Sequence, residues 1–295
     1  THPAQVFMGD VGALALGADA VARKITQDGP QAAGAAGAVR VIRNGSRGLY
    51  WLDPLVGVQT AQGRIAYGPV KASDVDGLLR AGFLSGGEHP LRLGLIEQHP
   101  FLARQQRLTF ERVGLTDPFS IDQYRASGGF TGLKRALAAK PAEIVQEITE
   151  SGLRGRGGAA FPAGIKWKTV LDQPAGQKYI TCNADEGDSG TFSDRMLMEG
   201  DPFSLIEGMA IAGLAVGATQ GFIYLRVEYP HAHRALLTAI ANARDAGFLG
   251  ASICGSERAF NIEVHRGAGA YICGEETAML ESLEGRRGEV RVRPP

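Results

Sequence analysis

The feature that most limits the possible folds is a regular alternation of strand-like and helix-like segments between residues 178 and 285. Residues 178–184 (KYITCNA), 221–229 (GFIYLRVEY) and 260–269 (FNIEVHRGAG) have the length and apolar content of buried strands. Helix-like segments at 202–218 and 231–250 connect them, and residues 273–285 predict a third helix. Strands that alternate with helices favour a largely parallel sheet, so we expect an α/β fold.

The first part of the chain predicts a separate, smaller α/β unit. Strand-like segments at 4–9, 38–45, 55–61 and 64–70 accompany helix-like segments at 17–27 and 73–84, the second capped by Ser73. A Gly/Ala-rich loop is expected at 27–38 and a linker at about 115–127. Residues 132–153 predict two helices, the second beginning at Pro141. A chain of 295 residues suggests two domains, which we place at 1–115 and 116–295.

Composition excludes several classes of protein. The chain carries 31 basic and 31 acidic residues, so its charge predicts neither a nucleic acid nor an acidic membrane surface as partner. The N-terminus lacks the pattern of a signal peptide. Residues 208–225 are uncharged, but Thr219, Gln220 and Gly221 interrupt them. The remaining run is too short to cross a bilayer, so a buried helix followed by a buried strand is expected.

Cysteine usage indicates a reducing compartment, and we therefore expect a cytoplasmic protein. The three cysteines, Cys182, Cys254 and Cys273, form no C-x-x-C motif. A disulfide framework is not expected. No cysteine and histidine set has the spacing of a zinc finger, and a cubane iron–sulfur cluster needs four cysteines. We therefore expect no metal site within this chain.

A glycine-rich stretch at residues 151–168 (SGLRGRGGAAFPAGIKWK) predicts a ligand-binding loop. Gly155-x-Gly157-x-x-Ala160 loosely matches the dinucleotide-binding fingerprint, but a predicted helix precedes it where that fingerprint follows a strand. We therefore do not expect a standard Rossmann first turn. Glycines let the backbone approach a planar or phosphorylated ligand closely. Phe161 beside Pro162 offers an aromatic face, and nearby cations are Arg154, Arg156, Lys166 and Lys168. A flexible surface loop is the alternative.

Two acidic segments follow predicted strands, at the sheet edge where open α/β folds bind ligands. Residues 182–195 (CNADEGDSGTFSDR) contain closely spaced polar side chains. Four explanations stay open: these side chains would bind a metal, cap a helix, bind ribose or ribityl hydroxyls, or form a solvated turn. In residues 267–276 (GAGAYICGEE), Glu275 and Glu276 fall in a first helical turn, where the helix dipole also favours acids. Cys273 is expected to be buried. The C-terminal arginines at 286, 287, 291 and 293 would bind phosphate or remain solvated.

Three segments together resemble one known family. Residues 155–167 (GRGGAAFPAGIKW), 182–195 and 269–285 (GAYICGEETAMLESLEG) occur in the order and spacing of the NADH-binding flavoprotein subunit of respiratory complex I. The same subunit type is the diaphorase module of NAD-reducing hydrogenases and of soluble NAD-dependent molybdenum or tungsten formate dehydrogenases. The resemblance covers about residues 121–295 and implies a Rossmann-like α/β domain with FMN as cofactor and NADH or NAD⁺ as substrate.

The resemblance also implies roles for individual residues. Those matched to flavin contacts are Gly155, Arg156, Gly157, Gly158, Lys166, Asn183, Asp185, Glu186, Tyr271, Gly274, Glu275 and Glu276. Those matched to contacts with the nicotinamide nucleotide are Phe161, Asp188 and Arg293. Asp188 stands where the family has glutamate, and Arg293 where it has lysine. Glu276 and Glu186 would be catalytic by orienting the nicotinamide carboxamide. The implied reaction is reversible hydride transfer between nicotinamide C4 and flavin N5, with electrons passed on to iron–sulfur clusters.

Residues 1 to about 85 resemble the thioredoxin-like [2Fe–2S] subunit that accompanies this family. Where cluster-bearing members have a C-x-x-x-C pair, residues 46–50 read SRGLY, and no cysteine precedes Cys182. We therefore expect a thioredoxin-like docking domain without cluster ligands. A fused, cluster-free domain of this kind resembles the beta subunit of soluble formate dehydrogenases most, the hydrogenase diaphorase subunit second, and complex I third.

The family continues beyond the last motif with a ubiquitin-like domain and a helical domain that ligates a [4Fe–4S] cluster, and neither is expected in this chain. Expected partners are a thioredoxin-like [2Fe–2S] subunit and a formate dehydrogenase catalytic subunit, or hydrogenase subunits, with no nucleic acid and no membrane insertion. Two alternatives stay open. A non-catalytic assembly scaffold would keep the fold without flavin, and a flavin-free NAD-dependent dehydrogenase would need a catalytic His or Lys–Tyr pair after a Rossmann turn.

Overall fold

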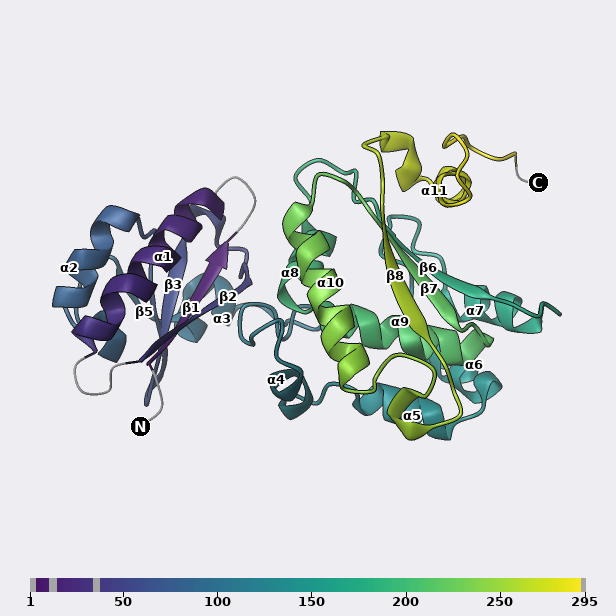
Figure 1. The fold of residues 1–295 in the computed structure, drawn as a ribbon, viewed down its shortest axis with the longest axis horizontal. Coiled ribbons are helices and arrows are strands. Elements are labelled where there is room, and N and C mark those ends of the chain that lie inside the picture. Colours follow the sequence, from purple (N-terminus) through teal and green to yellow (C-terminus); the bar gives the residue numbers. More distant parts are fainter. Residues whose placement is uncertain (1–3, 11–14, 34–37, 293–295) are drawn as a thin grey trace. The chain divides into compact units, whose positions relative to one another are not determined.

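The computed structural model describes residues 4–10, 15–33 and 38–292 and divides the chain into two compact units, Thr1–Pro118 and Phe119–Pro295 (Figure 1). Both units combine helices with a sheet, which confirms the predicted α/β class. Each unit has its own buried apolar core.

The first unit is built on a five-stranded mixed sheet with the order β2-β1-β3-β4-β5. The strands are β1 (Ala4–Asp10), β2 (Val39–Gly45), β3 (Leu55–Thr60), β4 (Gly63–Tyr67) and β5 (Arg92–Leu95). β1 and β2 run parallel, with Val6 beside Val41, and the other pairings are antiparallel. A parallel β1–β2 pair joined by a helix, followed by an antiparallel β3–β4 hairpin, is the arrangement of a thioredoxin-like sheet. The sequence did not predict β5.

Helix α1 (Ala15–Ala32) connects β1 to β2, and α2 (Val75–Arg80) follows β4. Val21, Ile25 and Leu78 are fully buried in the core of this unit. Two sequence predictions are wrong here. α1 continues through Pro30 to Ala32, where a loop was expected from residue 27. Ser73 does not cap a helix. The side chain of Asp74 accepts a hydrogen bond from the Lys71 amide at 2.8 Å instead.

Short elements complete the first unit. They are the 3₁₀ helices η3 (Tyr50–Leu52), η4 (Ala72–Asp74), η5 (Phe83–Ser85) and η6 (Ile96–Gln98), and helix α3 (Pro100–Ala103). Ser46 lies directly after β2, at the first position where cluster-bearing relatives would place a cysteine. Its hydroxyl donates to the Asp53 carboxylate at 3.2 Å. Tyr50, at the second such position, begins η3.

The second unit is built on three parallel strands in the order β6-β7-β8, which confirms the predicted parallel sheet. The strands are β6 (Tyr179–Ala184), β7 (Gln220–Leu225) and β8 (Asn261–Arg266). In register, Thr181 lies beside Phe222 and Phe222 beside Glu263, so all three strands end at the same sheet edge. The loops at this edge build the candidate site described below.

Eight helices accompany this sheet in the described part of the second unit. They are α4 (Ile121–Ala126), α5 (Thr131–Ala138), α6 (Pro141–Glu150), α7 (Ala163–Asp172), α8 (Ser193–Gly200), α9 (Pro202–Val216), α10 (Pro230–Asp245) and α11 (Glu276–Leu283). The 3₁₀ helices η7 (Ile253–Gly255) and η8 (Tyr271–Gly274) follow α10 and β8. Pro141 begins α6 as predicted. The sequence missed α4, α7 and α8, which lie in stretches taken for linker or loop.

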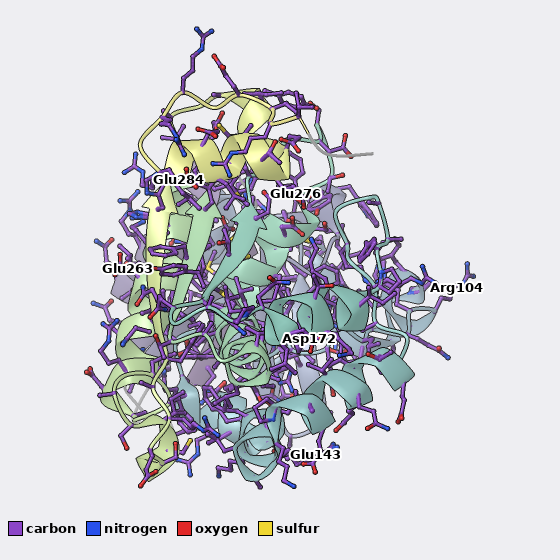
Figure 2. The ribbon with its side chains drawn as sticks, turned by 90° about the vertical axis from the view of Figure 1, so that its right-hand side faces the viewer. Arg104, Glu143, Asp172, Glu263, Glu276 and Glu284 are labelled. Carbon is purple, nitrogen blue, oxygen red and sulfur yellow. The ribbon has the colours of Figure 1, made fainter. Side chains whose placement is uncertain are left out.

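The uncharged stretch at 208–225 folds as the end of α9 followed by β7, as predicted. Along the described part of the chain, no helix combines the length and apolarity needed to cross a membrane. Charged side chains such as Glu143 on α6, Asp172 at the end of α7 and Glu263 on β8 are exposed (Figure 2).

Candidate functional site

The site begins where the loops after β6 and β8 meet. The Asn183 side chain donates from Nδ2 to the Gly274 carbonyl at 2.9 Å, and its Oδ1 accepts from the Asp185 amide at 3.2 Å. Gly187 lies so close to Tyr271 that a Cβ built on it would come within 2.9 Å of the ring. The two acidic segments, which 71 residues separate in sequence, therefore form one continuous surface.

This surface lines a cavity of about 810 Å³, within the range of small-molecule and cofactor sites. Of the residues predicted from sequence, those that line it are Arg156, Gly157, Gly158, Asn183, Asp185, Glu186, Asp188, Tyr271, Gly274 and Glu275. They come from all three predicted segments. The fold thus brings most of the predicted site together, and Tyr271 remains 79% exposed.

The glycine-rich loop connects α6 to α7 and is closed at its base. An antiparallel bridge joins Arg154 to Pro162, and the Gly155 amide donates to the Phe161 carbonyl at 2.9 Å. Gly158 has a φ of 97°, a backbone conformation that favours glycine. A Cβ on Gly157 or Gly158 would meet no protein atom within 4 Å. Packing within the protein therefore does not require Gly157, although it lines the cavity.

Glu186 is buried, with 8% of its surface exposed, and its carboxylate is fully engaged by the protein. Oε1 accepts from the Asp194 amide at 2.9 Å and the Ser193 hydroxyl at 3.2 Å. Oε2 accepts from the Tyr229 hydroxyl at 2.9 Å and the Arg195 amide at 3.2 Å. Its two backbone donors belong to the first turn of α8, whose N-terminal N–H groups need acceptors. Glu186 therefore anchors the acidic loop to α8.

The ring of Tyr229, whose hydroxyl binds Glu186, makes two cation–π contacts. The guanidinium of Arg226 lies 4.9 Å from the centre of the Tyr229 ring and that of Arg195 lies 5.5 Å from it. Arg226 also donates to the main-chain carbonyl of Glu186. Burial, followed by the hydrogen bond to Glu186, raises the pKa of Tyr229. Its hydroxyl thus stays protonated and keeps donating at neutral pH.

Burial changes the acidity of three groups on the cavity wall. It raises the pKa of Asp185, an effect that the charge of Arg226 opposes. It also raises the pKa of Asp194, with a further increase from the charge of Glu186. The pKa of the Cys182 thiol rises to about 12, mainly by burial and then by the charge of Asp194. Cys182 is therefore a protonated wall residue at neutral pH rather than a nucleophile.

Four of the described predicted residues lie outside the cavity lining, and a fifth lies outside the described part of the chain. Gly155 is at the base of the loop, and Phe161 is half exposed. Lys166 on α7 and Glu276 at the start of α11 form an exposed ion pair, with 3.4 Å between Nζ and Oε2 (Figure 2 labels Glu276). Arg293 lies outside the described residues. These placements leave the predicted roles of all five as predictions.

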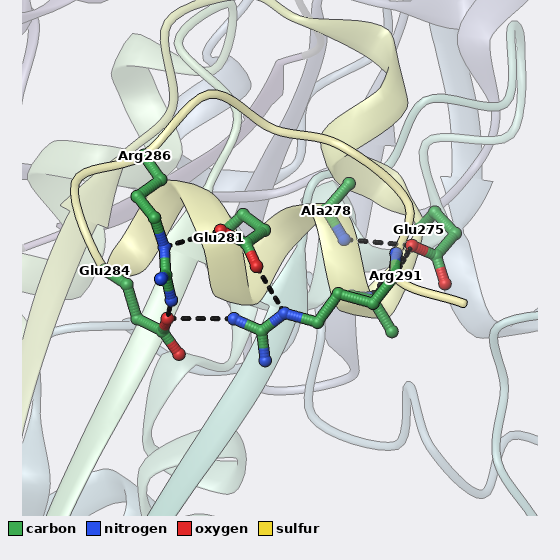
Figure 3. A network of polar contacts seen from close by, with 7 residues as sticks. Glu275, Ala278, Glu281, Glu284, Arg286 and Arg291 are labelled. Carbon is green, nitrogen blue, oxygen red and sulfur yellow. Dashed lines mark hydrogen bonds and ion pairs between the residues drawn. The ribbon is translucent and has the colours of Figure 1, made fainter. Parts of the chain in front are cut away.

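Glu275 lines the cavity and also caps α11. Its Oε2 accepts from the amides of Thr277 and Ala278, each at 2.9 Å, and from the Thr277 hydroxyl at 2.6 Å (Figure 3). The Arg291 amide then donates to the Thr277 hydroxyl oxygen at 2.9 Å. The capped helix end thus fixes the segment that follows α11 beside the cavity wall.

Ion pairs engage most of the described basic C-terminal segment. Arg286 and Arg291 both bind Glu281 and Glu284 on and after α11 (Figure 3). Arg287 lies 3.7 Å from Glu289. Arg286 and Arg287 are exposed, which agrees with the solvated alternative, and Arg291 is half-buried.

Half of the cavity lining was not assigned to the site from the sequence, and four of these residues lie on α8, which the sequence did not predict. The unassigned residues are Cys182, Ala184, Gly187, Thr191, Ser193, Asp194, Leu197, Met198, Leu205 and Ile272. Leu197 and Met198 on α8 and Leu205 on α9 give the cavity an apolar wall. The signal was present: Asp194 in a first turn, followed by the apolar triplet 196–198, is typical of a helix start.

These residues fit a flavin nucleotide. The cavity has an apolar wall, Asn183 and Asp185 as partners for hydroxyl groups, and Arg156 as a cation beside two loop glycines that leave room for a ligand. A carboxylate or amide oxygen accepts hydrogen bonds from a ribityl chain, and a guanidinium binds phosphate. Fold and site together define an α/β protein that binds a nucleotide cofactor at the carboxyl end of a parallel sheet.

Comparison with known proteins identifies the family. The model of the Nuo51 FMN-binding domain matches residues 148–295, half of the chain. The HndC polypeptide of the NADP-reducing hydrogenase of Solidesulfovibrio fructosivorans is 53% identical over 192 residues, covering 65% of this chain and 39% of that protein. An NADH-quinone oxidoreductase polypeptide of Aquifex aeolicus is 52% identical over 176 residues, covering 60% and 41%. The corresponding Escherichia coli polypeptide is 48% identical over 180 residues, covering 60% and 40%.

A solved structure resembles the whole chain. A chain of an NAD⁺-reducing [NiFe]-hydrogenase in the air-oxidized state aligns with a TM-score of 0.51 and 27% identity, covering 100% of this chain and 48% of that one. The present chain thus spans about two fifths of the curated relatives and about half of this structural relative. The chain belongs to the complex I-type family of NADH-binding flavoproteins, as the sequence motifs predicted, and FMN is the cofactor of its matched domain.

Proposed function

We propose that this chain is the FMN- and NADH-binding part of a diaphorase subunit, which exchanges hydride with a nicotinamide nucleotide and passes electrons to iron–sulfur clusters. The observation that carries the proposal is the cavity at the carboxyl end of the sheet, where the glycine loop and both acidic segments meet. The names of the relatives support an oxidoreductase role.

Within the cavity, each group has a defined task. Arg156 supplies positive charge to a phosphate, and Gly157 and Gly158 let the loop approach a flat ligand. Asn183 and Asp185 bind hydroxyl groups. Glu186 is reassigned from a catalytic role to that of a positioning residue, because its carboxylate accepts four hydrogen bonds from the protein.

The exposed side of the loop would bind the nucleotide. Phe161 offers an exposed ring face, and Lys166 on α7 and Glu276 on α11 form an exposed ion pair. Asp188, Glu276 and Arg293 are retained as proposed nucleotide contacts. When bound, FMN accepts a hydride and releases electrons singly. The chain's own work is to hold the two ligands in place and, through Leu197, Met198 and Leu205, to exclude water from one side of the cavity.

The finer proposal concerns the complex in which the subunit works. We propose a cytoplasmic, soluble NAD-dependent formate dehydrogenase, in which the first unit is a docking domain without its own cluster and a [4Fe–4S] cluster lies in another part of the subunit. Ser46 and Tyr50 at the positions of cluster ligands support this role for the first unit. A hydrogenase is the closest alternative, because a hydrogenase chain aligns along both units. Co-purification of the partner subunits, identified by mass spectrometry, decides between them.

Flavin binding tests the site directly. A Cβ at Gly157 meets no protein atom within 4 Å, and Gly157 lines the cavity, so Gly157→Val should weaken FMN binding at least about tenfold. Gly176→Val is the matched control, because a Cβ there also meets nothing and Gly176 does not line the cavity. FMN fluorescence quenching by the purified subunit measures both affinities. Equal affinities for the two variants would refute the site, and no flavin binding by the unaltered subunit would favour an assembly scaffold.

A further inference from the structure

A second, much smaller cavity lies inside the first unit. It has a volume of about 20 Å³ and is lined by residues of β1 to β4 and of the segments that follow β2, β5 and α3, among them Asn44, Arg47 and Arg64. A cavity needs only about 10–15 Å³ to hold one water molecule. This one therefore has room for a single water or a single monatomic ion.

Arg47 lines this cavity and carries an unsatisfied donor. The residue is only 6% exposed. Its two terminal nitrogens bind the Glu97 carboxylate in a bidentate pair at 2.7 and 2.9 Å. Its Nε is buried and has no hydrogen-bond partner. An unsatisfied buried donor costs about 1–3 kcal/mol, and more when the group is charged.

Arg64 is half-buried and presents a second unsatisfied donor, and its hydrogen bonds go to neutral groups only. Its terminal nitrogens donate to the carbonyls of Gly114 at 2.6 Å and Leu115 at 2.9 Å, both neutral acceptors. Its Nε is also buried without a partner. Burial, and then the charge of Arg47, lower the pKa of Arg64 to about 10. Buried charges in proteins are normally paired with an opposite charge.

The backbone is shaped to keep both side chains in place. A Cβ on Gly114, which has a φ of 78°, would come within 2.2 Å of Arg47 Cδ. A Cβ on Gly57 would come within 2.8 Å of Arg64 Cδ. The guanidinium of Arg64 lies 3.5 Å from the centre of the Phe7 ring. The two arginines thus occupy fitted positions rather than mobile surface ones.

Among the described residues around this cavity, positive charges outnumber negative ones. A third arginine, Arg107, donates to the Arg47 carbonyl at 2.7 Å. The charges that act on the pKa values of Arg64 and Arg107 are those of Arg47 and of one carboxylate, Glu97. A water molecule in the cavity would accept hydrogen bonds but leave this charge uncompensated. A monatomic anion would satisfy the donors and offset the charge.

We propose that this cavity is a binding site for a single halide-sized anion, held by the Nε–H groups of Arg47 and Arg64. It is separate from the flavin site and independent of the proposed function. The bound anion would stabilise the first unit. It would do so at the edge where cluster-bearing relatives place a metal cluster and this chain has residues 46–50.

Hydrogen–deuterium exchange on the full chain tests the site. Chloride is titrated against gluconate at constant ionic strength. Exchange of β3 and β4 should slow in a saturable way with chloride only, by about tenfold at chloride concentrations ten times the Kd. Exchange of β7 in the second unit is the internal control and should not respond. Equal slowing with gluconate would overturn the proposal.

Two variants sharpen the test. Arg64→Gln removes the charge and the Nε–H donor and should abolish the chloride response. Arg80→Gln, at an exposed arginine at the end of α2, should retain it. Persistence of the response in Arg64→Gln would contradict the site. If that variant does not fold, crystals of the unaltered chain soaked in bromide decide. An anomalous peak between the Nε atoms of Arg47 and Arg64 supports the proposal, and bromide at surface positions alone overturns it.

Discussion

Replacing Glu186 with glutamine tests whether this residue anchors the acidic loop. All four of its partners donate to the carboxylate. The hydroxyls of Ser193 and Tyr229 can rotate and accept from a glutamine NH₂ group. The amides of Asp194 and Arg195 cannot, and they bind different carboxylate oxygens. In either orientation of the glutamine amide, one backbone N–H therefore faces an N–H donor.

The expected cost follows from that single mismatch. A buried donor without an acceptor costs about 1–3 kcal/mol. For a unit of this size, 1 kcal/mol shifts the melting temperature by about 2–4 °C. Glu186→Gln should therefore lower the Tm of the second unit by about 2–12 °C. FMN affinity should fall as well, because residues 183–188 line the cavity.

Differential scanning calorimetry of the subunit measures the first effect, and flavin titration measures the second. Glu263→Gln is the matched control. Glu263 is exposed and accepts a hydrogen bond from Gln220 at 3.2 Å, which a glutamine oxygen can still accept. The reasoning fails if Glu186→Gln melts within about 1 °C of the unaltered protein. That result would show that α8 does not depend on the carboxylate.

Three further predictions concern other charged or titratable groups. Burial raises the pKa of Asp53 to about 6, so this carboxyl binds its proton more tightly in the folded protein than in the unfolded chain. The ionisation of Asp53 therefore lowers the stability of the first unit as pH rises from about 4 to 6. Asp53→Asn should remove that slope in urea unfolding, and an unchanged slope would refute the assignment. Iodoacetamide at pH 8 should label the exposed Cys254 well before the half-buried Cys182, whose pKa is raised to about 12, as read by mass spectrometry; equal rates would contradict that raised pKa. Lys166→Met breaks only an exposed ion pair, so it should change the unfolding free energy by less than about 1 kcal/mol yet weaken flavin or nucleotide binding. A stability loss with unchanged ligand affinity would oppose that role.

The sheet of the second unit was predictable because its strands are short apolar runs separated by long helices. β6, β7 and β8 appear where the pattern put them. The sheet edge where they end follows from the parallel arrangement, so the site could be located from sequence. The helices α7 and α8 carried weaker signals, of which Asp194 and the apolar triplet 196–198 at the start of α8 were the clearest. Glycine, proline and polar residues before them mask their starts, and tertiary contacts such as the Glu186 cap supply what the local sequence lacks.

Residue roles were harder to predict than residue positions. The motif match placed Glu186 at the site, but only the structure shows its carboxylate engaged by α8 and Tyr229. Likewise, the basic residues after α11 suggested phosphate binding or a solvated tail. Arg286 and Arg291 also pair with Glu281 and Glu284, which the sequence did not predict, because such pairing depends on how the chain folds back after the helix. Which side chains pair with one another depends on the folded chain and carries no local sequence signal.

The central claim is that this site holds FMN and exchanges hydride with a nicotinamide nucleotide. Anaerobic absorbance spectroscopy of the purified full subunit tests it most directly. The account predicts an oxidised flavin band that bleaches when NADH is added and returns when NAD⁺ is supplied in excess. A subunit that retains FMN but whose flavin band does not change with NADH would contradict the account.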